Sequence, residues 1–186
     1  TGDVLRVFTT RPDTLFGATF MVISPEHPLL EERREQIKNY DEVIKYQEDT
    51  NLRTEFERTQ MTKDKTGVRL DGLTAINPVN DAEIPIFISD YVLMSYGTGA
   101  IMGVPSGDQR DWEFATKFGI DIIEVVSGGD ITKEAYGGDG VMVNSGFLNG
   151  IDNIHEAVEK IMNFLEEKGM GKRKINYKLM DWIFSR

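Results

Sequence analysis

Residues 96–111 read Tyr-Gly-Thr-Gly-Ala-Ile-Met-Gly-Val-Pro-Ser-Gly-Asp-Gln-Arg-Asp, and this stretch decides most of what the sequence predicts about the fold. The short apolar run at 100–104 is typical of a strand, which Pro105 stops. We expect a helix over 108–118, closed by Gly119 at its C-terminal end. Hydroxyls, backbone N–H groups and carboxylates therefore gather at a strand end, where α/β proteins tend to build binding sites.

A second polar turn, Thr-Thr-Arg-Pro-Asp-Thr at residues 9–14, follows another apolar run. Residues 4–9 are rich in β-branched and apolar side chains, which predicts a strand. Pro12 fits the first turn of a short helix after that strand. The three threonine hydroxyls can orient a water molecule or an ester carbonyl. The same pattern is also ordinary helix-capping chemistry, so both interpretations stay open.

The rest of the chain alternates strands and helices without a strict βαβ order. The patterns predict further strands at 18–23, 67–76, 83–89, 120–126 and 175–186. They predict helices at 29–36, at 39–58 with a break near residue 50, and at 152–168. A glycine-rich acidic stretch at 127–140 is expected to form an exposed loop or flap. We therefore expect an α+β fold with a mixed, barrel-like β core surrounded by helices.

The composition argues against several classes of protein. The 186 residues suit one domain, or one domain with a small appendage. A net charge of −10 argues against binding nucleic acid without help, because phosphate contacts need a basic face. Zero cysteines exclude disulfides and thiolate metal sites and fit a reducing compartment. No apolar run approaches the roughly 20 residues that span a bilayer. The chain begins with Thr1 rather than Met, which suggests a piece of a longer protein.

Two features of residues 96–111 have structural as well as functional explanations. The Gly-Thr-Gly at 97–99 either forms a turn that needs positive φ, or lets the backbone approach a ligand such as an adenosine. Asp108 and Asp111 can cap the helix that follows them. Asp111 can also point into a site and pair with a cationic group such as an α-ammonium. Arg110 can neutralise Asp108 or meet a phosphate.

Taken together, the two polar segments resemble the editing domains of the leucyl-, isoleucyl- and valyl-tRNA synthetases. The Asp-Gln-Arg-Asp at 108–111 and the Trp-Glu-Phe-Ala at 112–115 resemble the bacterial-type leucyl branch. The final residues, 177–186, resemble the return of the chain into the catalytic domain of a synthetase. The resemblance thus implies an editing domain at 1–172, and a return linker with the start of the catalytic domain at 173–186.

The resemblance implies hydrolysis of the ester that joins a wrong amino acid to leucine tRNA, of the norvalyl, isoleucyl or methionyl type. One methylene group changes the binding free energy of an amino acid by only about 1–3 kcal/mol. A second, hydrolytic selection step is therefore useful to remove similar amino acids. The domain itself is expected to need no metal and no cofactor, while the parent enzyme uses ATP and Mg. The expected partners are the 3′ end of the aminoacylated leucine tRNA and the remainder of the synthetase chain. The same resemblance implies a cytoplasmic monomer that contacts no membrane.

The resemblance also implies roles for individual residues. Thr9 and Thr10 position the hydrolytic water and the ester, and Asp111 anchors the α-amino group; these three form the expected catalytic set. Thr14 shapes the amino-acid pocket and blocks leucine. The expected substrate-binding residues are Arg11, Asp13, Thr14, Tyr96, Met102, Val104, Asp108 and Arg110.

One position departs from the leucyl pattern. Ser106 and Gly107 stand where that pattern usually has a small residue and a histidine. Any contact of a histidine side chain at this position is therefore missing or replaced. An alternative function is a non-catalytic module that binds the aminoacylated 3′ end or braces the parent enzyme. A third is a nucleotide-binding domain built on residues 97–99, although a full phosphate-binding motif is missing.

Overall fold

The structure, a computed structural model, describes residues 2–54, 57–58, 65–95 and 97–174. A four-stranded sheet forms its centre, and the strands lie in the order β2-β3-β1-β4. β1 pairs in parallel with β3 and antiparallel with β4, while β2 and β3 form an antiparallel pair. The strands are β1 (Phe20–Ile23), β2 (Val68–Ile76), β3 (Glu83–Ile88) and β4 (Ala100–Gly103).

The mixed sheet and the α+β class are confirmed, whereas the barrel-like closure is not. Within the described residues the sheet is open, with β2 and β4 at its edges. Four strands, two of them only four residues long, are too few to close around a packed interior.

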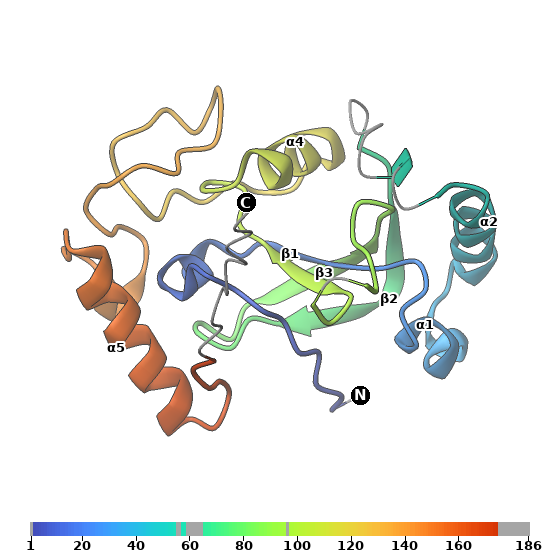
Figure 1. Cartoon of the computed structure of the whole chain (residues 1–186), viewed down its shortest axis with the longest axis horizontal. Helices are drawn as coiled ribbons and strands as arrows, with labels where there is room; N and C mark the ends of the chain where they lie inside the picture. Colours follow the sequence, from blue (N-terminus) through green and yellow to red (C-terminus); the bar gives the residue numbers. More distant parts are fainter. Residues whose placement is uncertain (1, 55–56, 59–64, 96, 175–186) are drawn as a thin grey trace, which may run out of the picture.

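Helices cover the sheet from three sides. In Figure 1, α4 lies above the sheet, α1 and α2 lie at one end, and α5 lies at the other end. The α-helices of the described residues are α1 (Leu29–Glu32), α2 (Tyr40–Asn51), α4 (Gln109–Phe118) and α5 (Ile154–Glu167). Three short 3₁₀ helices accompany them: η1 (Pro12–Gly17), η2 (Arg34–Gln36) and η3 (Gly146–Leu148).

The alternation of side chains along β1 explains the layers. Phe20 and Val22 point to one face of the sheet, where Phe20 stacks on Phe114 of α4 with ring centroids 5.2 Å apart. Met21 and Ile23 point to the other face and share a buried cluster with residues of α1 and α2. A third cluster packs α5 against η1. The sheet therefore holds α4 and η1 in fixed positions.

Local signals predicted the ends of α4 and α2. The Asp108 side chain caps α4 by accepting hydrogen bonds from the backbone N–H groups of Arg110 and Asp111, at 2.9 and 3.3 Å. Gly119 ends α4 in the left-handed region, with φ of 65°. The predicted break near residue 50 is also confirmed, because α2 ends at Asn51.

Two predicted strands are wrong. Leu5 and Val7 pack against the core cluster of β1, but residues 4–9 carry no strand pairing in the structure. The stretch at 120–126 likewise alternates half-buried and exposed side chains up to residue 124, yet its one ladder contact is an isolated bridge between Val126 and Met142. In both segments the alternating apolar side chains pack against neighbouring elements. The backbones of the two segments do not pair with a strand of the sheet. The predicted strand at 175–186 lies outside the described residues.

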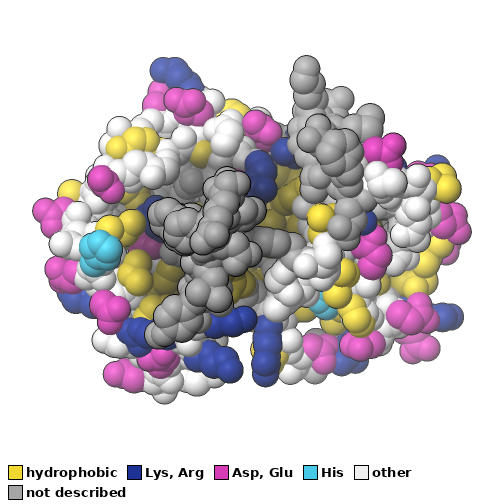
Figure 2. Space-filling model, viewed as in Figure 1, with side chains coloured by type: hydrophobic (Ala, Val, Ile, Leu, Met, Phe, Trp, Pro, Cys, Tyr) yellow, Lys and Arg dark blue, Asp and Glu magenta, His cyan; other side chains and the backbone are white. Residues whose placement is uncertain are grey.

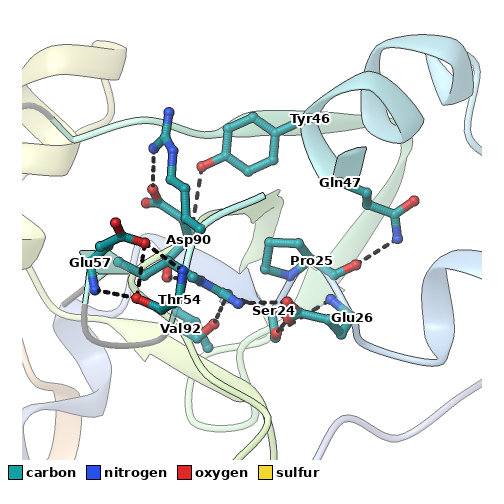
Figure 3. Close-up of polar contacts among 11 residues, drawn as sticks. Ser24, Pro25, Glu26, Tyr46, Gln47, Thr54, Glu57, Asp90 and Val92 are labelled. Carbon is teal, nitrogen blue, oxygen red and sulfur yellow. Dashed lines mark hydrogen bonds and ion pairs between the residues drawn. The ribbon is translucent and has the colours of Figure 1, made fainter. Parts of the chain in front are cut away.

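The carboxyl ends of the parallel strands β1 and β3 are closed by a buried polar network (Figure 3). The Arg58 guanidinium donates through Nε to the carbonyl of Asp90 at 2.9 Å and through Nη2 to the carbonyl of Val92 at 3.2 Å. It also pairs with the carboxylate of Glu26. Burial alone would raise the pKa of Glu26, but hydrogen bonds from Arg58 and Ser24 outweigh it and lower that pKa. This end of the sheet is therefore filled by the protein itself.

Candidate functional site

A cavity of about 200 Å³ lies at the opposite end of β1. It opens between the segment that enters η1, the end of β4, the start of α4 and the loop after residue 124. Its lining residues are Thr9, Thr10, Arg11, Thr14, Met102, Val104, Ser106, Gly107, Asp108, Asp111, Val125, Val126, Tyr136 and Gly137. The structure thus brings both sequence motifs to one cavity, with hydroxyls on one side and a carboxylate on the other.

The threonine segment combines turn chemistry with pocket lining. The hydroxyl of Thr14 donates to the carbonyl of Arg11 at 3.0 Å, and the backbone N–H of Arg11 donates to Oγ1 of Thr9, also at 3.0 Å. Thr9 and Thr10 are exposed, whereas Thr14 is buried. The turn chemistry of this segment is therefore confirmed, and the same hydroxyls border the cavity, while their role toward a water or an ester stays a prediction.

Asp111 is the buried carboxylate of the cavity, with 7% of the residue exposed. Its Oδ2 accepts a hydrogen bond from the backbone N–H of Val104 at 2.9 Å. Burial, followed by the nearby charge of Asp108, raises the pKa of Asp111 to about 7, while the Val104 bond, Arg110 and Lys65 act in the opposite direction. A carboxylate held this way gains most from a cation that enters the cavity, because an opposite charge favours the ionised form.

Met102 and Val104 supply apolar lining next to Asp111, and they come from β4 and its first following residue. Asp108 caps α4, as one interpretation expected, and it also lines the cavity, while a role toward a substrate stays a prediction. Arg110 is not part of the lining: 71% of its side chain is exposed, and its Nε lies 3.6 Å from Oδ1 of Asp108.

Asp13 acts on the cavity through Arg11. The Asp13 side chain is fully buried, and it accepts hydrogen bonds from Nε and Nη2 of Arg11 at 3.0 and 2.8 Å. These bonds raise the pKa of Arg11 and orient its guanidinium, which borders the cavity. Tyr96 lies outside the described residues. The substrate-binding roles of all these residues stay predictions.

Sequence reasoning missed the part of the pocket wall that comes from the glycine-rich loop at 127–140. Tyr136 lines the cavity, and its backbone N–H donates to the carbonyl of Ser106 at 2.8 Å. The indole of Trp112 on α4 donates to the carbonyl of Ile131 at 2.8 Å, which ties the loop to the helix. A single aromatic residue in a run of glycines and acidic residues is the signal that could have indicated this wall.

The Gly-Thr-Gly at 97–99 is a turn. Gly97 and Gly99 have φ of 70° and 69°, a region that glycine adopts without steric cost. A Cβ on Gly99 would lie 2.2 Å from the sulfur of Met94. Neither glycine lines the cavity. Turn geometry and packing therefore account for both, which favours the structural explanation of this motif.

Across the described ranges, no three His, Asp or Glu side chains come together as a metal site would require. Across the same ranges, no helix is both long and apolar enough to cross a bilayer. His27 and His155, the two histidines of the sequence, do not line the cavity.

The fold and the pocket define an α+β domain with one cavity that is lined by both threonine hydroxyls and a buried carboxylate. Comparison with known families places it more narrowly, since the family described as leucyl-tRNA synthetase, editing domain, matches residues 1–166. The chain belongs to this family, which confirms the resemblance noted in the sequence.

Two relatives illustrate the likeness. A leucine–tRNA ligase of Alkaliphilus oremlandii (strain OhILAs) is 59% identical over 187 residues, a match that covers 100% of this chain and 23% of the relative. The crystal structure of the ternary complex of Agrobacterium radiobacter K84 agnB2 LeuRS, tRNA and LeuAMS aligns with a TM-score of 0.72 and 30% identity. That alignment covers 98% of this chain and 19% of the other. The chain thus spans about a quarter of the length of such relatives or less.

Proposed function

We propose that the cavity hydrolyses the ester that links a wrong amino acid, of the norvalyl, isoleucyl or methionyl type, to leucine tRNA. The observation that carries this proposal is the convergence of Thr9, Thr10 and Thr14 with Asp111 around one cavity, in a chain of the editing-domain family. The 3′ end of the aminoacylated tRNA and the body of the synthetase are the partners in this proposal.

Asp111 anchors the α-ammonium group of the substrate. Its carboxylate is buried, lines the cavity and is held in place through Val104. A charge-assisted hydrogen bond in such a site is about twice as strong as a neutral one. Binding of the ammonium would also offset the burial that raises the pKa of Asp111, so that the carboxylate stays charged in the complex.

The threonine segment positions the ester and the water. Thr9 accepts a hydrogen bond from Arg11, which fixes its oxygen and leaves the hydroxyl proton free to donate. Thr10 stands exposed beside it at the edge of the cavity. Oriented donors near a developing oxyanion lower the barrier of acyl transfer, and one such donor is worth about 10²–10³ in rate. No covalent nucleophile is required, since water attacks the ester carbonyl directly.

Thr14 excludes the correct amino acid. Its hydroxyl is committed to the carbonyl of Arg11, which locks the β-branched side chain in one rotamer at the cavity wall. A rigid wall of this kind discriminates by the shape of the side chain, and the expected discrimination against the branch at the γ carbon of leucine is about 1–3 kcal/mol. Leucine is thereby rejected, while the linear norvaline side chain enters.

Gly107 favours a second candidate function. It lines the cavity at the position where the leucyl pattern usually has a histidine, and it offers no side chain to hold a water or a ribose hydroxyl. On this ground the chain could serve as a non-catalytic module that binds the aminoacylated 3′ end or braces the synthetase.

Deacylation of norvalyl-tRNA separates the two functions. The synthetase that carries this chain is compared with its Asp111→Ala variant and with a Glu156→Gln variant on α5, where Glu156 is exposed and pairs with Lys160. The hydrolase predicts fast deacylation by the wild type and by Glu156→Gln, and a loss of about 100-fold or more in Asp111→Ala. If the wild type is no faster than Asp111→Ala, the non-catalytic module is the better account.

A further inference from the structure

One buried hydroxyl in the cavity wall has no partner in the protein. Ser106 is 3% exposed and belongs to the lining of the cavity, but its Oγ makes no hydrogen bond to any described residue. The buried hydroxyls of Thr19 and Tyr91 also lack a partner among the described residues, and neither of these residues lines the cavity. An unpaired buried hydroxyl costs free energy, so most such groups in folded proteins are hydrogen-bonded. The hydroxyl of Ser106 is therefore a candidate binding group.

The backbone around Ser106 holds this side chain at a fixed place in the wall. The N–H of Gly107 donates to the carbonyl of Val104 at 3.0 Å, which closes a tight turn, and the carbonyl of Ser106 accepts from the N–H of Tyr136 at 2.8 Å. The N–H of Val104 holds the carboxylate of Asp111. Ser106 thus stands on the same turn as the anchor of Asp111. Because a serine turns its hydroxyl by rotation about one bond, it can meet a ligand without a movement of this backbone.

The residue after Ser106 leaves open space at the cavity wall. Gly107 also belongs to the lining, and a Cβ placed on it would meet nothing closer than Val104, at 4.0 Å. Gly107 is not among the glycines with positive φ, so its backbone does not require a glycine. Two successive residues therefore give the wall an unpaired hydroxyl and room for a small polar group, which are the two conditions for binding one.

We propose that Ser106 is a further ligand-contacting residue of the cavity, and that its hydroxyl binds a hydroxyl group of the reacting complex. This inference rests on the proposed function. The bound group belongs either to the attacking water or to the ribose that carries the ester. A serine suits both, since it donates one hydrogen bond and accepts others. Ser106 forms no covalent bond in this role; it holds its partner in position for the reaction.

The first test compares two buried hydroxyls. Deacylation of norvalyl-tRNA by the synthetase that carries this chain is measured for the wild type, Ser106→Ala and Thr19→Val. Both variants lose an unpaired hydroxyl, but only Ser106→Ala loses it from the cavity. We expect Ser106→Ala to slow deacylation about tenfold or more, and Thr19→Val to leave the rate unchanged. Neither variant removes a hydrogen bond between described residues, so the midpoint of thermal unfolding should not fall in either.

The outcomes separate this inference from the proposed function. An unchanged rate in Ser106→Ala, or an equal loss in Thr19→Val, overturns the inference and leaves the proposed function standing. A wild type that is no faster than Asp111→Ala overturns the proposed function, and the inference with it.

The second test identifies the group that Ser106 binds. A non-hydrolysable 3′-norvalyl-adenosine mimic and its 2′-deoxy form are titrated into the wild-type synthetase and into Ser106→Ala. If the ribose hydroxyl is the partner, Ser106→Ala weakens the first mimic about fivefold or more and leaves the deoxy form unchanged. If the attacking water is the partner, both affinities stay unchanged and the loss appears in the rate alone. Equal weakening of both mimics would indicate a change in the shape of the cavity and would overturn the inference.

Discussion

The carboxylate of Asp111 accepts a hydrogen bond from the backbone N–H of Val104 at 2.9 Å. This bond joins the start of α4 to the residue that follows β4. Both residues line the cavity, so the bond lies in its wall. The bond offsets part of the cost of burying the carboxylate charge.

Replacing Asp111 tests amine recognition. Asp111→Asn keeps the shape of the side chain and an oxygen for the Val104 N–H, but it removes the charge. We expect the affinity for the norvaline mimic to fall by about 30-fold or more, since losing a buried charge pair costs about 2–5 kcal/mol. Calorimetric titration measures this. A mimic without its amino group should bind both proteins equally, and an equal loss for both mimics would contradict the assigned role.

The same substitution should stabilise the fold. Burial raises the pKa of Asp111 from an ordinary value of 3.8 to about 7, so between these values the folded chain keeps a proton that the unfolded chain releases. The free energy of unfolding therefore falls as the pH rises through that window. Asp111→Asn should raise stability by about 2–4 kcal/mol near pH 8 and much less near pH 4. Urea unfolding at the two pH values decides; a gain that is independent of pH would refute this account.

Thr14 should control discrimination between norvaline and leucine. Thr14→Ala removes the side-chain branch at the cavity wall, so the leucine mimic should gain about tenfold or more in affinity. Thr14→Val keeps the shape but loses the hydrogen bond to Arg11, and it should retain most of the discrimination. The ratio of the two mimic affinities is the quantity to measure. A ratio that stays constant in Thr14→Ala would mean that another residue acts as the sieve.

Tyr136 is held by the glycines of its own loop. A Cβ on Gly129 would lie 2.4 Å from Cγ of Tyr136, so Gly129→Ala should displace the ring from the cavity wall and cost about 1–3 kcal/mol of stability. The Cβ of Tyr136 itself would lie 2.5 Å from the new Cβ, so only a Tyr136→Gly background removes the clash, and there the same change should cost little. Thermal unfolding of the four proteins tests the pair. Additive effects would show that Gly129 is required for another reason.

The network that closes β1 and β3 should contribute stability rather than binding. Arg58→Met leaves Glu26 and the carbonyls of Asp90 and Val92 without their buried donor, at a cost of about 2–4 kcal/mol. Arg53 is the matched control: it also pairs with Asp90, at 3.1 Å, but 48% of its side chain is exposed, so Arg53→Met should cost below about 1 kcal/mol. Similar losses for both variants would contradict this.

The sequence predicted those parts of the fold that local chemistry decides. The cap at Asp108, the end at Gly119 and the proline start of η1 each depend on one residue and its neighbours, and all three are confirmed. The strands expected at 4–9 and 120–126 depended on partners that the sequence does not specify. Their apolar residues pack as the alternation predicts, but they do not pair within the sheet.

The sequence predicted the two motifs of the candidate site, but it did not predict the loop that completes the cavity wall. Thr14, Met102 and Asp111 lie on short segments next to β1 and β4, so their approach follows from the pairing of those strands. The contribution of Tyr136 depends on where a glycine-rich loop folds back onto the segment around Ser106, about 30 residues earlier in the chain. Contacts between residues this far apart in the sequence cannot be predicted from a local pattern.

The charge of the chain fits a domain that grips only the end of an RNA. The net charge is −10, and Figure 2 shows acidic side chains around the margins of one face, with Lys and Arg side chains gathered only along part of its lower edge. Because phosphate contacts dominate the affinity for RNA, the proposed function requires that most of the affinity for a tRNA come from outside this chain. A complete synthetase should bind a whole tRNA much more tightly than an aminoacyl-adenosine. For the isolated chain, this difference between the two affinities should be smaller.

The most direct measurement is a structure of the chain with the 3′-norvalyl-adenosine mimic, together with the affinity of the leucine mimic. The account predicts that the norvaline group sits in the cavity between the threonine segment and Asp111, with its ammonium on the Asp111 carboxylate and its side chain against Thr14. It also predicts weaker binding of the leucine mimic. A norvaline mimic bound elsewhere, or one that shows no binding at millimolar concentration, would contradict the central claim that this cavity is an editing site.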